Sequence, residues 1–191
     1  MAVVSGILCQ IMTGNENGAG TNGKVYLGFG GREFRMDTHF DDYERGSYRT
    51  YIIGRGPDYP DLSPSQKYVD NSSWNNPEDD FVILTENLGK APVYIRFEPK
   101  NSRDAWNIRD ASVSVFIHTS EFVVGYTPPT GFDNLWMGDE AGKALYLTRE
   151  WRVGGPMMRY LSERHPALRE HFKLGTRPAA KTRRTSKRRP R

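Results

Sequence analysis

The stretch "GAGTNGKVYLGFG", residues 18–30, decides the fold class of this chain. Its first half comes within one residue of the phosphate-binding loop of NTPases, G-x-x-x-x-G-K followed by Ser or Thr. Val25 stands where the magnesium-binding hydroxyl should be. Such a loop must also open a helix, but apolar side chains alternate after Lys24 with the period of a strand. The glycines therefore predict a turn that leads into a β-strand.

Segments with strand period recur along the chain and are separated by turn residues: 5–13, 24–30, 32–37, 47–54, 81–86, 91–99 and 111–118. Two further segments, 134–138 and 143–150, flank "DEAG" as a predicted hairpin. About eight short strands without alternating helices favour an all-β fold, an antiparallel sandwich or barrel. One set of inward-facing side chains is expected to share a single core: Val25, Leu27, Phe29, Ile95, Phe97, Val113 and Val115.

The composition divides the chain into four parts. We expect a β-sandwich over residues 1–118, with a long loop inserted at 56–80, and additional strands or a hairpin packed on it over 119–155. Residues 156–173 predict a short helix, which Pro166 kinks or splits. Its apolar stripe has helical spacing: Met157, Tyr160, Leu161, Leu168 and Phe172. Residues 174–191 predict a disordered basic tail.

The charge of the chain is concentrated in that tail. The chain carries a formal net charge of +4, and without the tail cations residues 1–175 carry −4. The cations are Arg177, Lys181, Arg183, Arg184, Lys187, Arg188, Arg189 and Arg191. A flexible polycation attracts nucleic acid without sequence preference, or an anionic membrane surface. A solubilising extension is an equally common use of such a segment, and in a nucleated cell the tail also has the composition of a nuclear-import signal.

The remaining composition indicates an intracellular protein. The chain has one cysteine, so no internal disulfide is expected. Its N-terminus lacks the basic and apolar regions of a signal peptide, and no apolar run has the length of a membrane span. We expect a cytoplasmic location, or a nuclear one in a eukaryote.

Several motifs follow one another in an order that resembles the PLAT domain, the β-sandwich of polycystins, lipoxygenases and alpha-toxins. They are Thr13–Gly14, the turn Gly18 to Thr21, the strand Val25 to Leu27, Arg45 to Ser47, and Trp106 with Ile108. The resemblance covers roughly residues 5–118. It implies that residues 14–23 link the first two strands, and that Gly46 and Ser47 shape the entry to a later strand.

The resemblance also implies a docking function. PLAT domains serve as lipid- or protein-binding modules attached to enzymes, and some bind calcium through acidic residues in their loops. Here the acidic positions are depleted, so the remaining candidates form a weak set: Asn22, Asp42, Asn101 and Asp104. Calcium prefers six to eight oxygens with several carboxylates, and we expect no cofactor, with calcium possible but not favoured.

We therefore predict a non-catalytic module that docks on a protein or lipid surface through its sandwich loops, with the basic tail adding electrostatic attachment. Candidate contact residues are Trp74, Trp106, Asn22 and Arg45. Trp106 has the alternative of a buried residue at a strand end. A nucleic-acid-associated protein driven by the tail, and a small unrecognised enzyme, are the competing hypotheses. No histidine pair or nucleophile motif supports the enzyme.

Overall fold

The computed structural model describes residues 2–56, 63–70, 75–78, 82–117 and 121–150. Among them nine β-strands form one antiparallel system, with a four-residue helix α1 (Pro64–Lys67) and a 3₁₀ turn η1 (Thr85–Asn87). The all-β prediction is confirmed. The predicted helix at 156–173 and the basic tail lie outside the described residues. No helix among those described could cross a membrane, since none is long and apolar enough.

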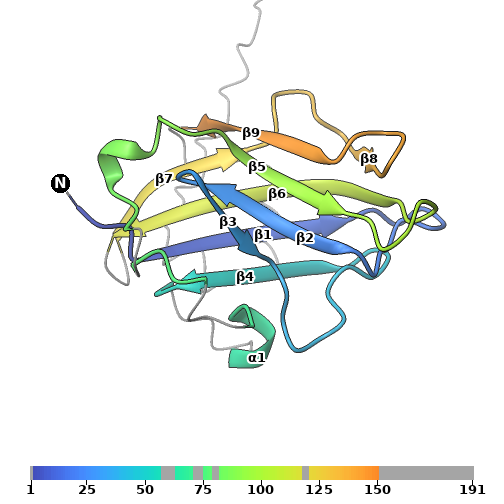
Figure 1. Ribbon diagram of the computed structural model, residues 1–191, viewed down its shortest axis with the longest axis horizontal. Helices are drawn as coiled ribbons and strands as arrows, with labels where there is room; N and C mark the ends of the chain where they lie inside the picture. The colour runs from blue at the N-terminus through green and yellow to red at the C-terminus, as the bar shows by residue number, and fades with distance from the viewer. Residues whose placement is uncertain (1, 57–62, 71–74, 79–81, 118–120, 151–191) are drawn as a thin grey trace, which may run out of the picture.

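Two layers of strands pack face to face (Figure 1). One layer holds β3 (Arg32–Arg35), β2 (Lys24–Phe29) and β5 (Val93–Glu98). The other holds β4 (Tyr48–Gly54), β1 (Gly6–Thr13), β6 (Trp106–Ile117) and β7 (Glu121–Thr127), and β8 (Leu135–Met137) extends it beside β6.

Strand β9 (Ala144–Glu150) belongs to both layers. Its first half pairs with β5, from Ala144 to Leu147, and its last three residues pair with β7. One side of the sandwich is thereby closed by backbone hydrogen bonds, and the ends of the strand order are β3 and β4. These two strands border the open side.

The inserted loop covers that open side. Tyr68 forms a parallel bridge with Ile52 of β4. The backbone amide of Arg35 in β3 donates to Asn75 Oδ1 (3.1 Å), and Asn75 Nδ2 donates to the Asp70 carbonyl (3.1 Å). The described parts of the predicted 56–80 insertion thus occupy the position where unpaired strand edges would otherwise face water.

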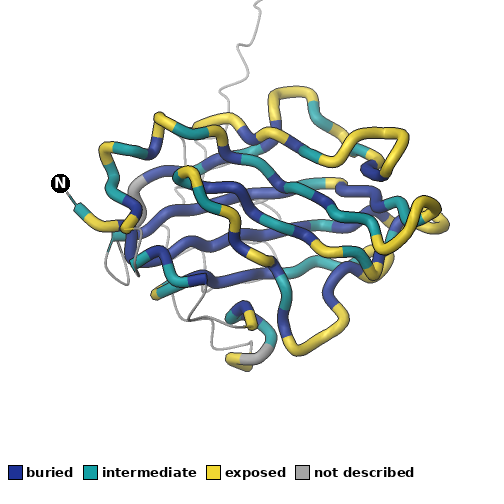
Figure 2. The backbone as a smooth tube through the Cα atoms, viewed as in Figure 1, coloured by how far each residue is buried: buried dark blue, intermediate teal, exposed yellow. Residues whose placement is uncertain are grey.

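The core lies between the two layers, and Figure 2 shows buried residues along the strands of both. Inward residues follow the period of two that strands impose. All seven core residues predicted from the sequence are buried in one cluster and at most 1% exposed: Val25, Leu27, Phe29, Ile95, Phe97, Val113 and Val115. The core prediction is confirmed.

The outer faces of the two layers differ in character. The outer face of β3–β2–β5–β9, which we call the tyrosine face, is polar and partly exposed: Tyr26, Glu33, Tyr94, Arg96 and Tyr146. The outer face of β4–β1–β6–β7, which we call the β1/β6 face, carries buried side chains outside the core cluster: Leu8, Gln10, Ile52, Ser112, Ser114 and Phe116.

Two predicted elements differ in the structure. Residues 82–86 of the predicted strand 81–86 form no strand: Leu84 makes an isolated bridge with Val3, and η1 follows. Ile83 is nevertheless buried, which explains the strand-like apolar run. The predicted hairpin around "DEAG" is reduced to a Gly138–Gly142 bridge, because β8 pairs with β6 while β9 joins the two layers.

Candidate functional site

The loops at one end of the sandwich form the candidate site, which we call the loop end: residues 18–23, 36–47 and 98–104. They connect β1 to β2, β3 to β4, and β5 to β6. The first of them is the glycine turn whose role the sequence predicted. β2 follows it directly, so the region is a strand connection and not a phosphate-binding loop with its helix.

The glycines of this turn serve backbone geometry. Gly18 has a φ of +76°, which side chains of L-residues rarely adopt. A Cβ at Gly20 would lie 2.9 Å from the Arg45 backbone nitrogen, and one at Gly23 would lie 2.4 Å from the Phe97 ring. The turn therefore packs against the Arg45 loop and against Phe97 of β5 at distances that only glycine permits.

The loop after β3 is held in shape by Asp42. Both of its carboxylate oxygens accept hydrogen bonds of 2.7 Å, from the backbone amide and from the hydroxyl of Thr38. The Arg49 guanidinium donates to the carbonyls of Asp41 (2.6 Å) and Asp42 (3.1 Å). Burial raises the pKa of the Asp42 carboxyl, which the Thr38 hydrogen bonds partly oppose. Asp42 is thus a structural acceptor.

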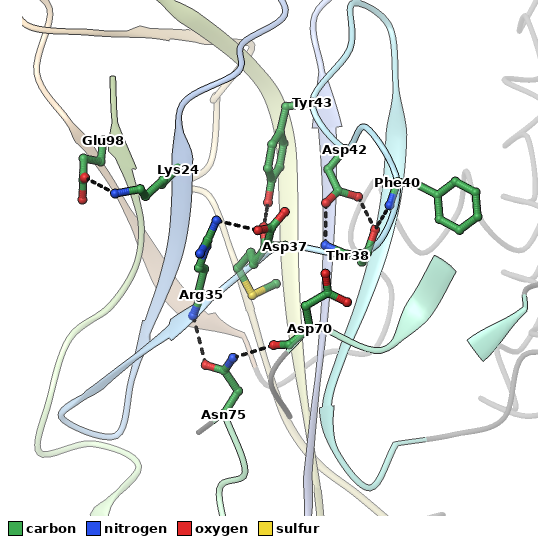
Figure 3. Close-up of polar contacts among 11 residues, drawn as sticks. Lys24, Arg35, Asp37, Thr38, Phe40, Asp42, Tyr43, Asp70, Asn75 and Glu98 are labelled. Carbon is green, nitrogen blue, oxygen red and sulfur yellow. Dashed lines mark hydrogen bonds and ion pairs between the residues drawn. The ribbon is translucent and has the colours of Figure 1, made fainter. Parts of the chain in front are cut away.

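The tip of that loop presents an aromatic ring to solvent. Phe40 is 44% exposed, and its backbone amide donates to the Thr38 hydroxyl (3.3 Å). Its ring points away from the polar cluster around Asp42 (Figure 3). The sequence analysis did not select Phe40. The signal was a phenylalanine in the otherwise polar or amphipathic run "DTHFDDYE", between two predicted strands.

The loop between β5 and β6 is tied to the glycine turn through Asp104. One carboxylate oxygen of Asp104 accepts from the Thr21 hydroxyl (2.7 Å), and the other accepts from the Lys100 backbone amide (2.8 Å). Asn101 Oδ1 accepts from the Arg103 amide (3.0 Å). These contacts fix the loop against its neighbour.

Two hollows lie side by side at the loop end and share Thr21, Asn22 and Lys100. The first, about 500 Å³, extends toward Phe40 and Asp42. The second, about 610 Å³, is lined by most of the residues that the sequence analysis selected: Asn22, Arg45, Asn101 and Asp104. The structure thus brings these four together, and places Asp42 in the neighbouring hollow.

The charges around the hollows are mixed. Lys24 pairs with Glu98 (3.0 Å), and Arg35 pairs with Asp37 (2.6 Å). Arg45, one of the predicted contact residues, donates to Asn17 Oδ1 (2.6 Å). Exposed Lys100 and Arg103 add positive charge beside the second hollow.

The two tryptophans proposed as contact residues have different outcomes. Trp106 is fully buried, and its indole nitrogen donates to the Thr13 hydroxyl (3.1 Å). It packs against Tyr43, with ring centroids 5.1 Å apart. Trp106 is therefore a core residue and not a contact residue, which corrects that candidate in favour of the alternative. Trp74 lies outside the described residues.

The predicted calcium ligands have most of their side-chain oxygens engaged. Asp42, Asn101 and Asp104 all accept hydrogen bonds from the loops that contain or adjoin them. Within the described part of the chain, no three His, Cys, Asp or Glu residues group as a metal site would require. The donor set is poor for a cation that prefers several carboxylates, and calcium binding stays a disfavoured prediction.

The similarities of this chain to known proteins are distant. No protein-family model matches the chain, and no curated protein matches it. Similar solved structures include an alpha-toxin from Clostridium absonum (18% identity, TM-score 0.46, covering 77% of this chain and 32% of the toxin). They also include a coral 8R-lipoxygenase, described with calcium activation through a C2-like domain (16% identity, TM-score 0.42, covering 84% of this chain and 20% of the lipoxygenase).

At these identities and TM-scores the likenesses carry no argument about this chain. The chain spans about a third of the alpha-toxin and a fifth of the lipoxygenase.

Proposed function

We propose that this chain is a non-catalytic binding module that docks on a lipid surface by its loop end. The observation that carries the proposal is the exposed Phe40 ring on a loop that Asp42 and Arg49 hold in shape. An exposed aromatic side chain on an ordered loop can enter a membrane interface without first ordering its backbone, and aromatic rings are favoured there.

Attraction to an anionic surface would come mainly from the basic tail, because the loop end is mixed in charge, with exposed Asp41 and Glu44 beside its cations. Lys100 and Arg103 lie exposed near the hollow that adjoins the Phe40 loop. The basic tail, residues 174–191, would add attraction of about 1 kcal/mol for each cation near an anionic membrane. The apolar contact of Phe40 and the cations of the tail therefore favour the same surface, an anionic membrane. Each contribution can be tested by its own variant.

The chemistry of the described side chains favours binding over catalysis. Cys9 is fully buried, and burial raises its pKa far above the ordinary thiol value, so its reactive thiolate is suppressed. The carboxylates of Asp42 and Asp104 act as internal acceptors. No grouping of titratable side chains in the described loops supplies a nucleophile with its base.

The test is binding of the full chain to vesicles of phosphatidylcholine alone, and of phosphatidylcholine mixed with phosphatidylserine. Phe40→Ala should weaken binding to the mixed vesicles about fivefold to tenfold, since it removes an apolar contact of roughly 1 kcal/mol. Tyr146→Ala is the matched control: Tyr146 is 60% exposed but lies on the tyrosine face, and binding should be unchanged.

The same assay separates the competing explanations. Equal binding with calcium and with EDTA is expected. If deletion of residues 176–191 abolishes binding while Phe40→Ala has no effect, attachment is electrostatic and the loop-end proposal is wrong. If the wild-type chain binds neither kind of vesicle, a lipid surface is excluded and a protein partner remains.

A further inference from the structure

The β1/β6 face has the composition and burial of a covered surface. Its side chains are at most 7% exposed, and they belong to the outward set because their neighbours in each strand are in the core: Leu8, Gln10, Ile52, Ser112, Ser114 and Phe116. In a two-layer sandwich an outward face is expected to meet water. An apolar sheet face that does not must be buried against another element.

Among the described elements, α1 contacts this layer at its margin, beside β4. The centre of the face, however, lies on β1 and β6, where Leu8 pairs with Ser114 and Gln10 pairs with Ser112. The paired positions of β6 and β7 at this point carry small residues, Ser114 and Gly125. Small side chains allow an element laid across them to come close to the sheet.

Gln10 gives an independent sign that a covering element is required. Its side chain is fully buried, and its Oε1 accepts from the Ser112 hydroxyl (3.1 Å), but its Nε2 has no hydrogen-bond partner among the described residues. A buried amide without an acceptor is unfavourable, because it has lost its hydrogen bonds to water and gained none in the protein. Buried polar groups are almost always paired, so the acceptor is expected on whatever lies over this face.

We propose that residues 156–172 of the same chain dock on the β1/β6 face. These residues have the sequence of an amphipathic helix with an apolar stripe that no described partner explains. Docking there would bury the stripe, cover Leu8 and Phe116, and bring backbone or side-chain acceptors to Gln10.

The connection is long enough. Glu150 pairs with Gly125, Gly125 with Ser114, and Ser114 with Leu8. Three strand spacings of about 4.8 Å separate the end of β9 from the centre of the face, roughly 14 Å. Residues 151–155 span up to about 17 Å when extended, so Pro156 can reach the centre directly from β9. As helix, residues 156–172 extend at most about 25 Å, and the kink or break predicted at Pro166 shortens that length, so the segment stays within the extent of the neighbouring strands.

The test is thiol labelling of the full chain. Ser114→Cys places a reactive group at the centre of the face, and Tyr146→Cys places one on the tyrosine face as the exposed control. Cys9 is buried, so the wild-type chain supplies the blank. We expect Ser114→Cys to react at least about 100-fold more slowly than Tyr146→Cys, as a group protected by an ordered element does.

Adding Leu161→Asp and Leu168→Asp to the Ser114→Cys chain should accelerate labelling at least about tenfold, because charges on the stripe oppose its burial. Rapid labelling without these changes, or slow labelling that they leave unaltered, would overturn the proposal. Protection that disappears on dilution would show a second copy on the face and would equally overturn it. Far-UV circular dichroism checks that each variant keeps its β-structure.

A second measurement does not depend on destabilised variants. A short bis-maleimide should join Ser114→Cys to Leu161→Cys within one chain, and should fail to join Tyr146→Cys to Leu161→Cys. Equal cross-linking from both faces, or none from Ser114→Cys, would exclude the docked arrangement. The inference is independent of the loop-end proposal, because neither experiment involves a membrane.

Discussion

The two outer faces of the sandwich share one backbone pattern but differ in how their side chains meet their surroundings. On the tyrosine face, the Arg96 guanidinium makes two bonds to Glu33 (2.6 and 2.7 Å) and lies 4.1 Å from the Tyr26 ring centroid. Its polar groups satisfy one another in contact with water. On the β1/β6 face, Phe116 is buried and Gln10 Nε2 lacks an acceptor. One face is complete as an outer surface, and the other requires a cover.

The strongest test of this contrast compares Phe116→Ala with Tyr146→Ala in the full chain. Phe116→Ala should lower the free energy of unfolding by about 3–5 kcal/mol, because Phe116 is fully buried. Tyr146→Ala should change it by about 0.5 kcal/mol or less. Urea denaturation measures both. Similar small losses would show that the β1/β6 face is exposed in solution.

The ion pair of the tyrosine face gives a smaller effect. Arg96→Met should lower the free energy of unfolding by at most about 1 kcal/mol at neutral pH, since both partners are partly exposed. The hydrogen bond from Arg96 lowers the pKa of Glu33 below its ordinary 4.5. The folded state then binds protons less readily than the unfolded state, so this stabilisation is present above the ordinary pKa and is lost as pH falls through the lowered one.

The difference between the wild type and Arg96→Met should therefore shrink in acid. A double-mutant cycle with Glu33→Gln isolates the pair. A difference that stays constant from neutral pH to below the ordinary pKa of Glu33 would show that Arg96 stabilises this face by packing on Tyr26 and not by charge.

Replacing Asp110 should give the smallest change in the free energy of unfolding, and a gain instead of a loss. It pairs with Met12 on the margin of the β1/β6 face, and burial raises its pKa above the ordinary 3.8, with Arg109 and the Ala111 amide partly opposing. The ionised form is then disfavoured in the folded state, and stability from this group is gained as pH falls. Asp110→Asn should be more stable than the wild type by a few tenths of a kcal/mol at neutral pH, and this advantage should disappear in acid.

Urea titrations at several pH values measure that crossover. If the advantage of Asp110→Asn were instead negative at neutral pH, cations from another part of the chain would be pairing with the carboxylate. The contrast between the faces would then include a charged contact at the margin of the cover.

The sequence predicted the features that depend on local period and on backbone geometry. Alternation placed Val25, Leu27 and Phe97 in the core, and the glycine turn at 14–23 links β1 to β2 as expected. The alternation of apolar and polar residues identifies the core face of a strand more clearly than a second, outward face that is also buried. Leu8 and Phe116 stand at outward positions beside serines and a glutamine, so their burial was not apparent.

The features that the sequence did not predict depend on partners distant in the chain. Asp104 accepts from Thr21, 83 residues away, which changes a potential calcium ligand into a loop connector. The apolar run at 82–84 resembled a strand because Ile83 is buried, yet its backbone makes one bridge. Pairing choices of this kind are decided by three-dimensional packing, which a single sequence does not display.

The position of β9 has a consequence for synthesis on the ribosome. β9 is the last described strand in the chain, yet it supplies the hydrogen bonds that join β5 to β7. Until residues 144–150 have left the exit tunnel, both strands present unpaired edges, which are sites of wrong association. The nascent chain therefore cannot complete its sandwich step by step from the N-terminus. The edges of β5 and β7 must avoid pairing with other chains until β9 is available to pair with both.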